Sequence, residues 1–202
     1  MKSLLPFSIL FVAITAAGIA SAQTPEPVVR LRGTVQNATP TTLTVKDRSG
    51  ETVTLGLPDK LVVQEVYPIA LADIKAGSFI GTAALPQPDG TQRAIAVMVF
   101  PESARGTGEG SRPFDLQPDS TMTNATVADL AEAPTGRTLR LKYKDGEKTV
   151  VVPPNAPVVS FKPGDRSLLV PGASVSLSAQ AVNGAPMAQR INAGRGGFAL
   201  PY

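Results

Sequence analysis

The sequence predicts an all-β protein of two tandem homologous, small, barrel-like (OB-like) meander units, joined by a Gly/Pro-rich connector. Two observations predict the fold class. Apolar and polar residues alternate in short runs, the pattern of a strand with one buried face, and turn residues separate these runs. A third observation predicts the duplication: the order of the runs repeats, with Val45 and Leu141, and Ile95 and Ile191, each 96 positions apart.

Residues 1–22 read as a signal peptide. Lys2 precedes an uncharged, mostly apolar run over 4–19, and Ala20-Ser21-Ala22 has the small residues of a cleavage site. We therefore expect an exported, periplasmic protein that begins at Gln23, with no membrane span after cleavage.

Residues 23–100 form the first predicted β-barrel-like unit. Asp47 to Gly50 reads as a hairpin turn, and 70–74 is long enough for one helical turn only. In the last strand of the unit, Ile95, Val97 and Val99 are the expected buried set. Six short strands are expected, at 29–35, 42–46, 53–55, 61–66, 79–85 and 93–100.

Residues 101–121 form the predicted connector, whose glycines and prolines would interrupt any helix or long strand. The second β-barrel-like unit is expected at 122–194, and 195–202 is expected to be a flexible tail. Short strands of this kind hide their edges best when a sheet curls into a small barrel.

The connector also supplies the candidate site, because it places both signs of charge and an aromatic side chain on a loop between two scaffolds. Phe114 is further expected to dock in the groove between the units and to tie them together, since it would otherwise be exposed. The alternative is an ordinary linker that packs Phe114 and Leu116 against both halves. The candidate ligand-binding or partner-binding residues are Arg105, Glu109, Arg112, Phe114 and Asp115.

Composition argues against several chemistries. The chain has no Cys and no His, which removes thiol chemistry, His-based triads and His metal sites. The Gly-rich stretch at 106–110 lacks the following helix and Lys of a phosphate loop. The net charge is only +3 and Trp is absent, so nucleic acid is not an expected partner. We predict no catalytic residues, no metal ligands and no cofactor.

Several segments carry a family likeness. VRLRGTV (29–35), TLTV (42–45) and LADIKAG (71–77) resemble the DUF5666-type β domain of exported bacterial proteins. The central stretch from Phe100, together with 122–127, is similar to an alphaproteobacterial periplasmic group without an assigned role. The resemblance implies a periplasmic, β-rich protein and supplies no catalytic residues.

The sequence therefore predicts a non-catalytic binding or cell-envelope-associated module. Its expected partner is an envelope protein or an anionic envelope component. Two other hypotheses stay open: a carboxylate-based hydrolase at the cleft between the units, and an accessory factor for periplasmic metal handling.

Overall fold

The computed structural model describes residues 27–133 and 136–202, and the predicted signal peptide lies outside this range. The described chain folds into strands and three short 3₁₀ turns, so the all-β prediction is confirmed. It contains no helix with the length and apolar character that crossing a bilayer would take. The strands are β1 (Val29–Ala38), β2 (Thr42–Asp47), β3 (Thr52–Gly56), β4 (Val62–Pro68), β5 (Phe79–Pro86), β6 (Gln92–Val99), β7 (Gly110–Pro113), β8 (Thr121–Ala133), β9 (Gly136–Tyr143), β10 (Gly146–Val152), β11 (Val158–Pro163), β12 (Ser174–Val182) and β13 (Ala185–Gly194). The 3₁₀ turns are η1 (Leu71–Asp73), η2 (Glu102–Ala104) and η3 (Arg166–Leu168).

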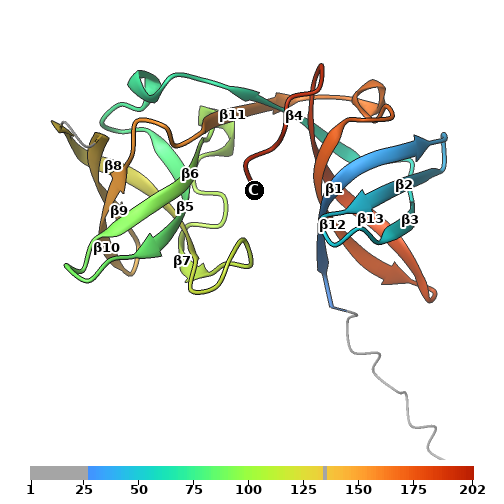
Figure 1. The fold of residues 1–202 in the computed structure, drawn as a ribbon, viewed down its shortest axis with the longest axis horizontal. Helices are drawn as coiled ribbons and strands as arrows, with labels where there is room; N and C mark the ends of the chain where they lie inside the picture. The colour runs from blue at the N-terminus through green and yellow to red at the C-terminus, as the bar shows by residue number, and fades with distance from the viewer. Residues whose placement is uncertain (1–26, 134–135) are drawn as a thin grey trace, which may run out of the picture.

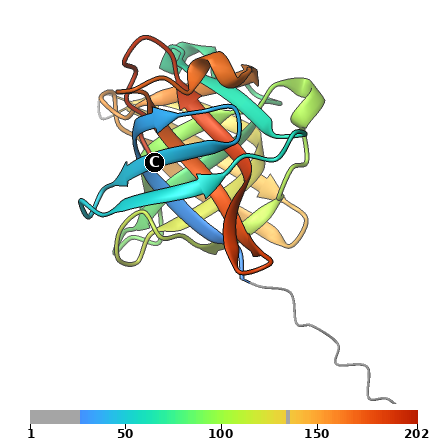
Figure 2. The ribbon, with the colours of Figure 1, turned by 90° about the vertical axis from the view of Figure 1, so that its right-hand side faces the viewer.

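Strand pairing closes two rings of five strands each. Ring 1 comprises β1, β2, β3, β12 and β13, and it closes where Met187 of β13 pairs with Gly56 of β3. Ring 2 comprises β5, β6, β8, β9 and β10, and it closes through the parallel pair of β6 and β10. The rings lie side by side in Figure 1, and Figure 2 turns ring 1 toward the viewer.

Each ring takes strands from both halves of the chain. Strands β1–β3 pair with β12 and β13 rather than with β5 and β6, which belong to ring 2. Strands β4 and β11 pair antiparallel with each other and run between the rings (Figure 1). Neither 23–100 nor 122–194 therefore closes a ring from its own strands alone.

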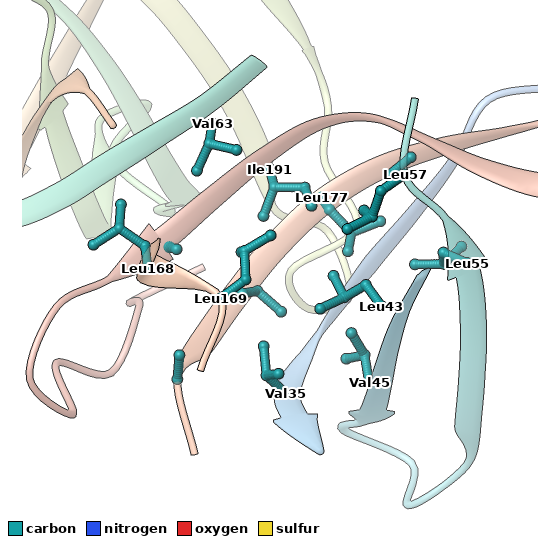
Figure 3. Close-up of a cluster of buried hydrophobic side chains, with 14 of the residues drawn as sticks. Val35, Leu43, Val45, Leu55, Leu57, Val63, Leu168, Leu169, Leu177 and Ile191 are labelled. Atoms are coloured by element: carbon teal, nitrogen blue, oxygen red, sulfur yellow. The ribbon is translucent and has the colours of Figure 1, made fainter. Parts of the chain in front are cut away.

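The core of ring 1 follows directly from the alternation in the sequence. Leu43 and Val45 of β2 point inward, whereas Thr44 and Lys46 between and beyond them do not. Figure 3 shows Leu168 of η3 and the following residue Leu169 reaching into the same cluster. An equivalent cluster fills ring 2, with Ile74 after η1 in the corresponding place.

Two predicted core positions of β6, Ile95 and Val99, are only partly buried. Ile95 is only half-buried, whereas Ala94, Ala96 and Val97 are buried. The register of β6 against β5 shifts between Ala83 and Ala84, so Ile95 has no partner across the strands. A bulge of this kind inserts one residue and reverses the alternation beyond it, which a period-two pattern cannot anticipate. The other predicted members, Val45, Leu141 and Ile191, are fully buried.

The segment 195–202 was predicted to be a flexible tail, and this is wrong for its last residues. Leu200 and Tyr202 are buried in a third apolar cluster with Val66 of β4 and Phe161 of β11. Arg195 also donates to the buried carboxylate of Glu65, at 2.8 Å. Burial of apolar side chains and of a paired carboxylate fixes this segment between the two rings.

Candidate functional site

A cleft of about 440 Å³ lies between the two rings, and the third apolar cluster borders it. One wall comes from the outer face of ring 1, with Arg30 and Arg32 on β1. The other comes from the outer face of ring 2, with Met122 and Asn124 on β8. These residues alternate with the inward-facing ones on the same strands, so the alternation that builds each core also lines the cleft. The described lining residues are Arg30, Arg32, Gln64, Gly81, Ala83, Ala96, Met98, Phe100, Ser103, Ala104, Thr107, Arg112, Phe114, Met122, Asn124, Phe161, Ser176, Arg190, Asn192 and Tyr202.

The charge of the cleft has one sign. The charged side chains among its described lining residues are all arginines: Arg30, Arg32, Arg112 and Arg190. A guanidinium stays protonated at any physiological pH and offers a fixed set of donors. The cleft therefore favours a negatively charged occupant.

The connector covers part of this cleft. Phe114 lies beneath two guanidinium groups, with the Cζ atoms of Arg30 and Arg32 at 5.9 and 5.2 Å from its ring centroid. The next residue, Asp115, accepts two hydrogen bonds from Arg32, from Nη2 at 2.7 Å and Nη1 at 3.2 Å. These bonds hold the pKa of the Asp115 carboxyl below its ordinary value. The aromatic ring and the carboxylate thus fix the connector to ring 1 and orient Arg32.

Four buried polar side-chain atoms have no hydrogen-bond partner in the described part of the chain. They are Arg32 Nε, Asn124 Oδ1, Asn192 Oδ1 and the Tyr202 hydroxyl. All four belong to residues that line the cleft. Buried polar atoms without partners are uncommon in folded proteins, because each forfeits its hydrogen bond to water. Their concentration in one cleft makes this cleft the candidate binding site.

A glycine shapes the wall of ring 2. A Cβ atom at Gly81 of β5 would lie 2.8 Å from Asn124 Oδ1 and 3.1 Å from a ring carbon of Phe100. Only glycine leaves room for both side chains. Asn124 is then held by its amide nitrogen, which donates to the Thr107 carbonyl of the connector at 2.9 Å.

The structure brings some of the predicted site residues to the cleft. Arg112 and Phe114 line it, and Asp115 binds a lining residue. Arg105 lies elsewhere, bonded to Glu102 and to the Gly77 carbonyl. Glu109 accepts from the backbone N–H of Lys144. These two residues fasten the connector to ring 2 and its neighbouring turn.

Other lining residues were missed by the sequence reasoning. Arg30 and Arg32 were interpreted only as the polar positions of a strand, and Tyr202 was placed in a flexible tail. Arg30 and Arg32 alternate along one strand and share one of its faces, but two arginines in this arrangement are equally typical of a solvated surface. Asn124, Arg190 and Asn192 carry no local signal, because their meeting depends on which strands pair.

No group of three or more acidic residues in the described chain could hold a metal ion. The cleft also brings no pair of carboxylates together among its described lining residues. Comparison of the chain with protein-family models, with curated proteins and with solved structures found no match. The resemblance to the DUF5666-type domain stays a prediction.

Proposed function

We propose that the protein is a non-catalytic binding module that holds an anionic ligand in the cleft between its two rings. One observation carries this proposal: every buried polar side-chain atom that lacks a partner in the described chain belongs to this cleft. Water can serve such atoms when the cleft is empty, and a ligand that reproduces those hydrogen bonds would replace it.

The size and charge of the cleft support the same proposal. A volume of about 440 Å³ falls within the roughly 300–1,000 Å³ typical of small-molecule sites. Four arginines around one cavity favour a carboxylate or phosphate, which guanidinium groups bind through paired hydrogen bonds. The ligand is therefore a small anion or the anionic end of a larger molecule.

The cellular setting belongs to the proposal as well. The signal-peptide pattern of residues 1–22 favours export, and we propose a periplasmic module that binds an anionic component of the cell envelope. The DUF5666-type likeness is consistent with that setting.

We further propose that the chain arose by duplication of an OB-like unit whose two copies exchange strands. The pairings of β1 with β12, β3 with β13 and β4 with β13 have counterparts in β8 with β5, β10 with β6 and β11 with β6. A duplication in which each copy completes the barrel of the other would produce this correspondence.

The geometry of the cleft supports the hydrolase and metal-handling hypotheses less well than it supports anion binding. A carboxylate hydrolase needs two carboxyl groups facing one substrate, and metal handling needs converging oxygen ligands. The charged lining residues of the cleft are arginines instead.

The proposal is tested by NMR with methyl-labelled methionine. Met98 and Met122 line the cleft, whereas Met187 lies on β13 beside Gly56 and serves as an internal control. Benzoate should shift the signals of Met98 and Met122 in a saturable manner, and neutral benzamide should bind at least about tenfold more weakly. Equal responses to the two probes, or a response of Met187 alone, would contradict the proposal.

A variant pair completes the test. Arg30→Gln combined with Arg190→Gln should weaken benzoate binding by at least about tenfold, because two charge-assisted contacts are lost. Arg48→Gln, an exposed hairpin position outside the cleft, should leave benzoate binding unchanged. If both variants bind benzoate like the parent, the cleft is not the site.

A further inference from the structure

The two walls of the cleft differ in chemistry although they occupy equivalent positions in the strand ladders. In ring 1, Arg32, Ser176 and Asn192 are successive cross-strand partners on β1, β12 and β13. In ring 2, the successive partners on β8, β5 and β6 are Asn124, Gly81 and Met98. The first row is polar and charged, whereas the second combines one amide with a glycine and a thioether.

The wall of ring 2 continues as an apolar surface. Ala83, Ala96 and Met122 extend it, and the rings of Phe100 and Phe161 border it in an edge-to-face pair 5.5 Å apart. Methionine side chains are flexible and adapt to apolar groups of different shape. This wall therefore suits a hydrocarbon or aromatic body. Its charged neighbour is Arg112 of β7, which pairs with Met122 and donates to the Gly108 carbonyl at 2.8 Å.

The unpartnered atoms on the two walls are of opposite kinds. Both terminal nitrogens of Arg32 bond to Asp115, which leaves its Nε as a buried donor without an acceptor. Asn124 donates through Nδ2 to the Thr107 carbonyl, which fixes the amide orientation and leaves Oδ1 as a buried acceptor without a donor. One occupant that satisfies both must carry an acceptor and a donor.

We infer that the ligand is an amphipathic anion that carries a hydroxyl or N–H group close to its acid group and an apolar chain or ring beyond them. The acid group lies against the arginines and Arg32 Nε, the donor bonds to Asn124 Oδ1, and the apolar body lies along the wall of ring 2. This inference rests on the proposed function, because it assigns a ligand class to the same cleft.

Three probes separate the parts of the inference. 3-Hydroxydecanoate has all three features, decanoate lacks the donor, and 3-hydroxybutyrate lacks the long chain. Titration of the purified protein by calorimetry, below the concentration at which the probes form micelles, gives the three dissociation constants. 3-Hydroxydecanoate should bind about tenfold more tightly than decanoate, because it satisfies a buried acceptor. It should bind at least about thirtyfold more tightly than 3-hydroxybutyrate, because six further methylenes leave water.

A variant identifies the donor contact. Asn124→Leu removes the unpartnered acceptor, so this variant should bind 3-hydroxydecanoate and decanoate with about equal dissociation constants, while decanoate still binds. Asn155→Ala, an exposed change outside the cleft, should keep the parent preference and serves as the control. Thermal unfolding of Asn124→Leu checks that the variant is folded, and Asn124→Ala replaces it if the larger side chain prevents folding.

The outcomes also separate this inference from the proposed function. If benzoate shifts Met98 and Met122 but the three acids bind with equal affinity, the cleft binds anions and the ligand class is wrong. If the preference for the hydroxyl persists in Asn124→Leu, the donor contact is wrong. If neither benzoate nor any of the acids binds, the proposed function fails as well.

Discussion

Replacement of Phe114 by alanine should destabilise the protein measurably, because this side chain joins the connector to the region between the rings. Phe114 is half-buried and packs against the third apolar cluster, which includes Phe161 and Tyr202. Truncation of a fully buried phenylalanine costs about 3–5 kcal/mol, and half-burial reduces this to roughly 2 kcal/mol. Loss of the contacts with Arg30 and Arg32 adds about 0.5 kcal/mol each at a partly exposed site. We therefore expect a loss of about 2–3 kcal/mol in the free energy of unfolding.

Urea unfolding followed by circular dichroism measures this loss. Gln117→Ala, at an exposed position of the same segment, is the matched control and should change the free energy of unfolding by less than about 0.5 kcal/mol. Trypsin supplies a second readout, because cleavage of the connector after Arg105, which Gly106 follows, should be slow in the parent and faster in Phe114→Ala. If Phe114→Ala unfolds like the parent and both are cut equally fast after Arg105, the connector is not docked and the reasoning fails.

Two further predictions concern pH. The hydrogen bonds from Arg32 lower the pKa of Asp115, so their stabilising effect is present above the ordinary pKa of about 4 and is lost as the pH falls through the lowered folded-state pKa. Asp115→Asn should lower the free energy of unfolding by about 0.5 kcal/mol at pH 7, and near pH 2 the variant and the parent should be equally stable. A difference in urea unfolding that stays constant over this pH range would contradict the linkage. Burial raises the pKa of the Tyr202 hydroxyl, so its neutral form is favoured in the folded protein, and stability should fall as the pH rises above about 10. At pH 11, Tyr202→Phe should therefore be more stable than the parent by roughly 1 kcal/mol. At pH 7 its free energy of unfolding should equal or slightly exceed that of the parent, because the Tyr202 hydroxyl has no partner in the described chain. Equal losses of stability in alkali for the two proteins would show that the hydroxyl is not buried.

Local patterns in the sequence predicted most of the strands and the hairpin turn, because alternation and turn residues act over a few positions. Gly50 indeed takes a positive φ of 94°, as the predicted turn requires. The bulge at Ile95 was missed, since it depends on packing between strands and not on the pattern within one. The burial of Tyr202 was missed for a similar reason: a short segment after the last strand is buried only because β4 and β11 provide an apolar surface for it.

The candidate site depends on strand pairing more than on any motif. The predicted connector contributed Arg112 and Phe114, which lie on one short segment and could be seen together. Arg30, Asn124 and Asn192 lie far apart in the chain and on different strands, so no spacing in the sequence connects them. They meet because the strands of both halves are distributed over both rings.

The same arrangement explains how one cleft can present two different walls. If each half closed its own ring, sequence changes in one half would alter a whole ring. In the observed pairing, β1 of the first half and β12 of the second half build the charged wall, while β5 and β8 build the apolar wall. Each wall therefore combines residues from both halves. The row Arg32–Ser176–Asn192 can differ in chemistry from the row Asn124–Gly81–Met98 without change to either core, because these side chains lie on the outer faces. The inward positions preserve the rings, and the outward positions between them are free to form a site.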